Sequence, residues 1–219
     1  MWVHTMSSSR DTHLFISEHR GGEAIKEHLE GYEGTAIHDG WKSYQKFECE
    51  HGLCNAHHLR ELTFLYEVQH LDWAKAFSDL LLSAYRQTLE GPLSVEDQTK
   101  IREQAQAILD QAKVQHPPPE PPLPGHRGRV RKSKARNLIE RFEKYSHQVW
   151  LFITGRQFPF DNNQAERDIR MLKTMQKVKG CFRTLEGAAH HLRIRSIILS
   201  LQKKEQNILS FFTHLLRPI

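Results

Sequence analysis

The first third of the chain alternates short apolar runs with turn-forming residues, a pattern typical of β-strands. Trp2–Ser8 and His13–Ser17 are two such runs on either side of a polar turn, so they predict an antiparallel hairpin. Gly22–Leu29 has the apolar spacing of a short helix. Thr35–His38 predicts a strand that ends at an Asp-Gly pair, and Gly52–Cys54 predicts another brief extended piece.

From His57 onward the spacing of apolar residues changes to that of helices. Six further helix starts are expected, three of them marked by residues that commonly cap helices. The expected helices begin at His57, at Asp72 as an N-cap, at Ser94 as an N-cap, near Ala135 (running to about Thr154), near Leu185 (running to about Lys204) and at Asn207 as an N-cap.

Residues 117–125 are mostly proline, so they cannot form the interior of a helix or sheet, and an extended spacer is expected there. Strands that precede helices indicate an α+β fold. We divide the chain into a β-rich part (1–56), a helical insertion (57–115), a Pro-rich basic linker (116–136) and a helical remainder (137–219).

The composition is that of a globular protein, with 38% hydrophobic and 26% charged residues. No run approaches the roughly 18 apolar residues of a membrane span, and the N-terminus has no secretory pattern. We therefore expect no membrane partner. Three cysteines do not indicate a disulfide framework, so a reducing cytoplasm is expected.

The net charge of +5 is concentrated in two basic stretches. Residues 115–136 hold six Lys or Arg and one acid, and residues 163–183 hold six Lys or Arg and two acids. Such stretches favour polyanionic partners. Two solvated basic faces without a ligand are the alternative.

Two acidic residues stand where a metal ion could be bound. Asp39 follows a short apolar strand, which would hold its carboxylate at an end open to solvent; an ordinary Asp-Gly turn is the alternative. Glu166 follows Asn163 at the spacing of a helix-capping box, which is its structural interpretation. Its functional interpretation places it on the first turn of a helix, facing a metal ion, with Arg170 orienting its carboxylate.

A stripe suited to phosphates is expected beside Glu166 on the same helix. This stripe comprises Arg167, Arg170, Lys173 or Thr174, and Lys177. Together with other members of the basic stretches, the expected phosphate contacts are Arg167, Arg170, Lys173, Lys177, Arg183, Arg129, Arg131 and Lys132.

Cys54 and His57 have a spacing that zinc sites use. Zinc needs about four ligands, and although Cys49 and His51 are near, no second matching pair is evident. The alternative is a buried cysteine and a hydrogen-bonded histidine that fix the junction between a strand and a helix.

Four stretches, taken in order, resemble the insertion-sequence-66 family of DDE transposases, and the similarity covers nearly the whole chain. They are His-Asp-Gly-Trp-Lys-Ser-Tyr (38–44), Cys-Asn-Ala-His-His-Leu-Arg-Glu-Leu (54–62), Phe-Asp-Asn-Asn-Gln-Ala-Glu-Arg-Asp-Ile-Arg-Met-Leu-Lys (160–173) and Lys-Gly-Cys-Phe-Arg-Thr (179–184).

The resemblance implies a ribonuclease H-like catalytic core in which three acids hold two divalent ions, Mg²⁺ or Mn²⁺, for DNA cleavage and strand transfer. Asp39 matches the second acid and Glu166 the third, while Cys54 and His57 match the family's Cys-x-x-His. Transposon ends and target DNA are the implied partners, and a homo-oligomer in a bacterial cytoplasm is the implied setting.

The family's first acid, on a central strand ahead of the hairpin, has no counterpart in this sequence. Asp11 is the only acid before Glu18, and it lies in the hairpin turn. We therefore expect a truncated copy whose core lacks its first strand and which is inactive alone. Two other functions compete: a non-catalytic DNA-binding remnant that uses the basic stretches, and a zinc-stabilised interaction module centred on Cys54 and His57.

Overall fold

A computed structural model describes residues 1–120 and 130–217, which form two compact units. The hairpin unit consists of Met1–Tyr32, Lys42–Glu48 and Asn162–Ile219. The helical unit consists of Glu33–Trp41 and Cys49–Asp161. Both units combine helices with a two-stranded sheet, so the α+β prediction is confirmed. The predicted division into four segments stays a prediction.

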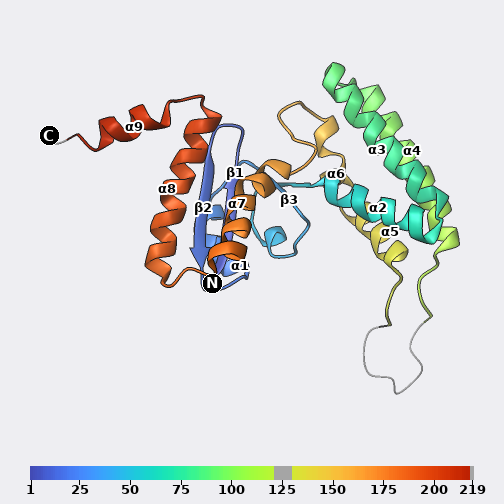
Figure 1. The fold of residues 1–219 in the computed structure, drawn as a ribbon. Coiled ribbons are helices and arrows are strands. Elements are labelled where there is room, and N and C mark those ends of the chain that lie inside the picture. The colour runs from blue at the N-terminus through green and yellow to red at the C-terminus, as the bar shows by residue number, and fades with distance from the viewer. Residues whose placement is uncertain (121–129, 218–219) are drawn as a thin grey trace. The chain divides into compact units, whose positions relative to one another are not determined.

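The hairpin unit is built on two antiparallel strands, as the alternating pattern predicts. β1 (Trp2–Ser7) pairs with β2 (Thr12–Ser17) so that Ser7 lies opposite Thr12. Two long helices, α7 (Asn163–Lys179) and α8 (Leu185–Lys203), pack against this hairpin (Figure 1). The apolar residues between helices and strands form one small core, made of Leu14, Leu172 and Leu192 with Val3, Ile16, Ile169, Met175 and Leu199 around it.

A group of aromatic and histidine rings lies between the hairpin and α1 (Gly22–Leu29). The bounds of α1 match the predicted helix. Phe15 of β2 stacks with His13 and packs against His28 of α1, with ring centroids 3.9 Å apart in the second pair. Ile25 and Leu29 of α1 are buried. A short 3₁₀ turn, η1 (Tyr44–Lys46), belongs to the same unit.

Side chains of α8 cover the outer edge of β2. The backbone N–H of Leu14 donates to Ser196 Oγ at 2.8 Å, and the N–H of Thr12 donates to Ser200 Oγ at 3.0 Å. The two serines are one helical turn apart, which matches the two-residue repeat of N–H groups along one strand edge. The helix thus satisfies edge groups that would otherwise be open to pairing with another chain.

Ser196→Ala is expected to lower the free energy of unfolding by about 1–3 kcal/mol, because the buried N–H of Leu14 loses its acceptor. Urea denaturation followed by circular dichroism measures this difference. Ser83→Ala is the control, since Ser83 is an exposed helical serine that accepts only a long hydrogen bond from Gln87. Equal stability of the two variants would contradict the edge-covering role of Ser196.

The helical unit contains the second sheet, in which β3 (Thr35–His38) runs parallel to β4 (Glu50–Leu53). A Cβ added at Gly52 would lie 2.4 Å from the Ile37 side chain, so the close approach requires glycine. The helices of this unit are α2 (Asn55–Gln69), α3 (Asp72–Glu90), α4 (Val95–Gln115), α5 (Lys134–Lys144) and α6 (Ser146–Val149), followed by the 3₁₀ turn η2 (Leu151–Ile153).

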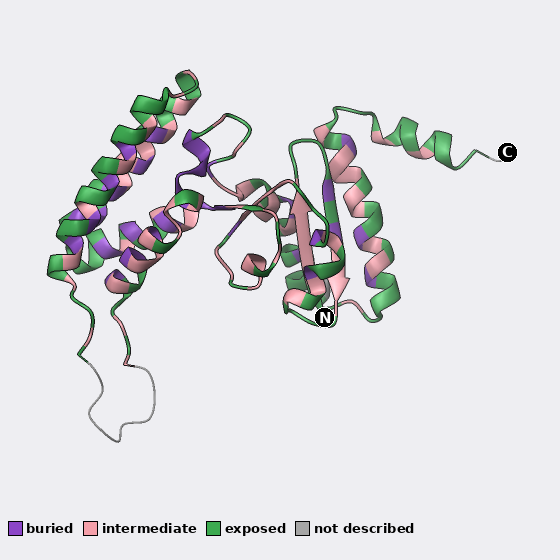
Figure 2. Ribbon diagram, turned by 180° about the vertical axis from the view of Figure 1, so that it is seen from behind, coloured by how far each residue is buried: buried purple, intermediate pink, exposed green. Residues whose placement is uncertain are grey.

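The core of the helical unit is aromatic at its centre. Phe77 of α3 stacks on Phe142 of α5 with ring centroids 4.3 Å apart, and Trp150 packs beside Phe77. All three side chains are buried. Figure 2 shows that burial in this unit is concentrated where its helices face one another. The helical spacing of apolar residues that begins at His57 is therefore consistent with the inner faces of these helices.

The predicted helix starts are right in part. Ser94 accepts a hydrogen bond from the N–H of Asp97, and Asn207 caps α9 (Ile208–Leu215) through the N–H of Ser210, as predicted. Asp72 is wrong as a cap, because Leu71 holds that position and Asp72 lies in the first turn. Helix α2 begins at Asn55, two residues before the predicted start.

The single helix predicted from Ala135 to Thr154 is wrong. Helix α5 ends at Lys144, because Tyr145 has a backbone conformation outside the helical region (φ −113°, ψ 27°). The chain continues through α6 and η2 in separate short turns. Of the proline-rich and basic segment, residues 121–129 lie outside the described residues, and so the predicted contact Arg129 does too.

Candidate functional site

Asp39 lies at the carboxyl end of β3, as the sequence predicts. Its side chain is exposed, and its Oδ1 accepts a hydrogen bond of 3.0 Å from the N–H of Trp41. Gly40 has φ +84°, a left-handed conformation that glycine adopts without cost. The carboxylate is therefore held by a tight turn at the end of a half-buried strand, in contact with solvent.

Two neighbouring histidines, His38 and His51, stabilise this turn through hydrogen bonds. His38 is buried, and its Nδ1 accepts the N–H of Gly40 at 3.0 Å, while its Nε2 lies 3.2 Å from His51 Nδ1. Because Nδ1 accepts, Nε2 carries the proton and donates to His51. Burial and the neighbouring His51 lower the pKa of His38 to about 4, against the opposing effect of Asp39. His38 is thus neutral at pH 7 and fixes the position of Gly40.

Glu166 lies near the start of α7, on the face that points away from the core. Residues 166, 170, 173 and 177 share this face, whereas Asp168, Leu172 and Met175 share the opposite face, which packs on the hairpin. The cap of α7 is Asn162 and Asn163 is its first residue, so the capping box predicted with Asn163 as the cap is wrong.

Glu166 therefore stands in a row with three basic residues. Arg170, Lys173 and Lys177 are exposed, and none of them forms an ion pair within the described residues. Arg167, at the side of this row, donates to Gln164 Oε1 at 2.9 Å. We call Arg170, Lys173 and Lys177 the basic row.

The remaining predicted contacts lie elsewhere. Arg183 is exposed between α7 and α8 of the hairpin unit. Arg131 is exposed in the helical unit, where Lys132 forms an ion pair with Glu140. The positive charge of Lys132 is therefore partly neutralised within the chain, unlike that of the basic row.

A buried charge on α7 was missed by the sequence analysis. Asp168 Oδ2 accepts hydrogen bonds from Ser7 Oγ (2.7 Å), Thr12 Oγ1 (2.7 Å) and Lys203 Nζ (2.9 Å). Its Oδ1 accepts from Gln164 Nε2 at 2.8 Å. Burial raises the pKa of the Asp168 carboxyl, but the hydrogen bonds from these four side chains outweigh it and lower the pKa below its ordinary value.

Lys203 completes this network from the end of α8. Its ammonium group donates to Ser7 Oγ at 2.6 Å and to the backbone carbonyls of Ser8 and Asp11 at 3.0 and 3.3 Å. The side chains of Asp168 and Lys203 are 3% and 11% exposed. Two strands, the turn between them and two helices of the hairpin unit therefore meet at one buried ion pair.

The Cys-Asn-Ala-His-His segment lies at the junction of β4 and α2. Cys54 is buried, and its backbone N–H donates to the carbonyl of His38 at 2.9 Å. Asn55 Nδ2 donates to the carbonyl of Val149 at 3.0 Å, and His58 Nδ1 lies 3.0 Å from Asn55 Oδ1. Asn55 thus ties this junction to the end of α6, and His58 is in hydrogen-bond contact with Asn55.

Candidate metal ligands lie in both units. Across residues 1–120 and 130–217, no three His, Cys, Asp or Glu side chains are grouped to hold a metal ion. The zinc hypothesis for Cys54 and His57 therefore lacks a ligand cluster in that part of the chain. Asp39 belongs to the helical unit and Glu166 to the hairpin unit. Both are carboxylates, the hard oxygen donors that Mg²⁺ and Mn²⁺ prefer.

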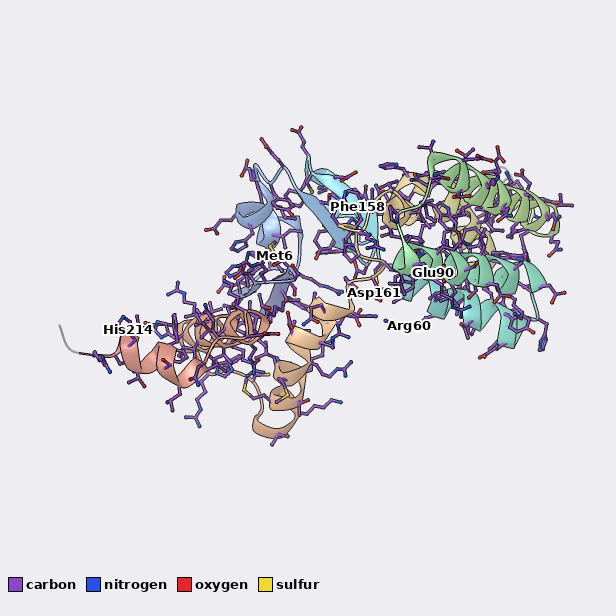
Figure 3. All side chains as sticks on the ribbon, turned by 90° about the horizontal axis from the view of Figure 1, so that it is seen from above. Met6, Arg60, Glu90, Phe158, Asp161 and His214 are labelled. Carbon is purple, nitrogen blue, oxygen red and sulfur yellow. The ribbon has the colours of Figure 1, made fainter. Side chains whose placement is uncertain are left out.

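A cavity of about 400 Å³ lies in the helical unit, between the end of α3 and the segment before α7. Phe158 and Asp161 of that segment and Glu90 of α3 are labelled in Figure 3. The aromatic part of its wall comprises Tyr85, Phe152, Phe158 and Phe160. Tyr85 and Phe160 stack on each other with centroids 4.4 Å apart, and Phe152 packs edge-on against Phe160. Three of these four rings thus pack against one another within the protein.

Comparison with protein families gives one match: the model of the transposase IS66 family matches residues 1–190. Comparisons with curated proteins and with solved structures found no significant match. The matched range contains Asp39, Cys54, His57, Glu166 and the basic row, whereas Lys203 lies beyond it. No helix in the described ranges is both long and apolar enough to cross a membrane.

Proposed function

The chain belongs to the IS66 family of transposases, which supports a function in transposition, and from this premise we propose that it is part of a DNA-cleaving catalytic domain. The observation that carries the proposal is the face of α7 that bears Glu166 together with Arg170, Lys173 and Lys177. An acid in line with exposed cations is suited to a phosphodiester backbone approached by a divalent ion. The parallel β3–β4 pair with Asp39 at its end supports a ribonuclease H-like core.

Each group has a proposed role. Asp39 and Glu166 hold Mg²⁺ or Mn²⁺, and when bound the ions activate the attacking oxygen and stabilise the leaving oxygen of the phosphodiester. The turn fixed by His38 orients the carboxylate of Asp39. The basic row positions the DNA backbone through its phosphates, for transposon ends and target DNA alike, in a homo-oligomer in the bacterial cytoplasm.

We further propose that these 219 residues bind DNA but do not cleave it by themselves. Asp39 and Glu166 are the two acids that match the family's motifs, and two carboxylates hold a pair of divalent ions weakly. DNA binding needs no third acid, because phosphate contacts by Lys and Arg supply most of its free energy.

The DNA-binding part is tested by salt dependence. Replacement of Arg170, Lys173 and Lys177 by Gln is expected to make the salt dependence of DNA binding less steep. The size of the negative slope of log K (the association constant) against log salt concentration should fall by about 3, at about 0.9 for each lost phosphate contact. Fluorescence anisotropy with duplex DNA at several salt concentrations measures the slope. The control replaces Lys26, Lys75 and Lys100 by Gln, an equal loss of charge from residues already in exposed ion pairs. Equal slopes for both triple variants would contradict the proposed DNA interface.

The catalytic part has its own test. Incubation with transposon-end DNA and Mn²⁺ is expected to give no cleavage; cleavage that disappears in Asp39→Asn would show that two acids suffice and overturn the proposed inactivity.

The competing function is a non-catalytic DNA-binding remnant, which the basic row also favours. If Mn²⁺ strengthens DNA binding and Glu166→Gln abolishes that effect, the metal-binding role is supported. An identical Mn²⁺ response in Glu166→Gln would favour the remnant.

A further inference from the structure

We propose that Asp168 and Lys203 are positioning residues, which set the rotation of α7 about its axis and thereby aim Glu166 and the basic row at DNA. This inference rests on the proposed function. It concerns residues outside the predicted site: Asp168 entered the sequence analysis only as a charge, and Lys203 lies beyond the family match.

The geometry of α7 makes rotation the decisive variable. Asp168 lies on the helix face opposite to that of Glu166 and the basic row. A helix held on its inner face by apolar contacts alone can turn or slide by small amounts, because such contacts have no preferred direction. The neighbours of Asp168 on this face, Leu172 and Met175, provide contacts of that kind.

Hydrogen bonds are directional, so they can fix the rotation of α7 where apolar contacts do not. The Asp168 carboxylate receives bonds from Ser7 on β1, Thr12 on β2 and Lys203 on α8, three separate elements of the hairpin unit. Directional bonds from three elements to one carboxylate oxygen, Oδ2, restrict both the sliding of α7 along its axis and its rotation about that axis. Any rotation of α7 would break bonds that are shielded from water, so the outward face is fixed as well.

Glu166 lies close to this network along α7. Asp168 is in the second turn of the helix, two residues after Glu166. In the Glu-Arg-Asp segment, Glu166 on the outer face of α7 and Asp168 on its inner face are thus separated by about half a turn of helix.

The test uses a variant that keeps the net charge. Asp168→Leu with Lys203→Met removes one negative and one positive charge, so the general attraction to DNA is unchanged, and apolar replacement of a buried pair commonly keeps a protein folded. The control is Glu143→Leu with Lys113→Met, which removes the Lys113–Glu143 pair of 2.6 Å from the helical unit. The salt slope of duplex-DNA binding is measured without divalent ions, after circular dichroism has confirmed equal helix content.

The size of the negative salt slope is expected to fall by about 2 for the Asp168–Lys203 variant and to stay unchanged for the control. An unchanged slope in the first variant, with a lower slope in the Arg170, Lys173 and Lys177 triple variant, overturns the positioning role alone. If the triple variant also has an unchanged slope, the proposed DNA interface fails and the positioning role fails with it. If the charge-neutral variant does not fold, Ser7→Ala with Thr12→Val removes the two hairpin hydroxyls instead. Its salt slope is then compared with that of the control, and an unchanged slope overturns the positioning role.

Discussion

Asp168→Ala is expected to lower the free energy of unfolding by about 3–5 kcal/mol, the largest effect of any single substitution proposed for this chain. The substitution leaves the ammonium group of Lys203 buried without its carboxylate, and it removes the acceptor of the Ser7 and Thr12 hydroxyls. The cost arises from these stranded groups more than from the attraction that is lost. Urea denaturation followed by circular dichroism measures it.

Two comparisons separate this explanation from a general effect of losing an acid. Asp79→Ala breaks the Lys75–Asp79 pair, whose side chains are 51% and 61% exposed, and is expected to cost less than about 1 kcal/mol. Asp168→Leu with Lys203→Met removes both charges together and is expected to recover most of the loss. A double variant as unstable as Asp168→Ala would show that the ion pair itself, and not the stranded lysine, carries the stability.

The fold was predictable where the pattern of apolar residues is local. The hairpin and the strand before Asp39 follow from alternation over a few residues, and their bounds agree closely with the structure. The helix expected through residue 154 was wrong because Val149–Ile153 are all buried. A helix packed on one side buries only a stripe of its surface, so five consecutive buried residues require the chain to turn. That apolar run was the available signal.

The sequence predicted the local placement of the candidate residues. Asp39 directly follows a strand, and Glu166 and the basic row lie on a helix, as expected, while their roles stay predictions. Asp168 was missed because its partners Ser7 and Thr12 are 161 and 156 positions away in the sequence. Its phase with Leu172 on the inner face of α7 was the one local sign that this carboxylate is buried.

The junction between β4 and α2 shows the same limit. Cys54 and His57 attracted attention because their spacing resembles that of metal ligands, and the structural alternative was a hydrogen-bonded histidine at this junction. His58, the next residue, also takes part in this junction, because its ring contacts Asn55 and packs against Phe142 with centroids 5.0 Å apart. Adjacent histidines on a helix point 100° apart, so the choice between them depends on which face the rest of the unit covers.

Acidification from pH 7 to pH 5 is expected to destabilise the helical unit by about 4 kcal/mol through two buried histidines, about 2 kcal/mol for each. Burial, with smaller effects of Arg141 and His57, lowers the pKa of His58 to about 3, and burial with His51 lowers that of His38 to about 4. In the unfolded chain both titrate near 6.5. Below pH 6.5 the unfolded state therefore binds more protons than the folded state, and stability is lost as the pH falls toward 4 and 3.

His58→Gln isolates one of these contributions, because glutamine keeps an N–H donor for Asn55 and does not titrate. The variant is expected to lose about 2 kcal/mol less than the parent protein between pH 7 and pH 5. Urea denaturation at both values, followed by tryptophan fluorescence, measures the difference, since Trp73 and Trp150 are buried in this unit. His147→Gln is the control, because the His147 side chain is 67% exposed. A pH-dependent loss in His58→Gln equal to that of the control would mean that His58 is not kept neutral by burial, since a neutral buried ring is the only source of the predicted difference.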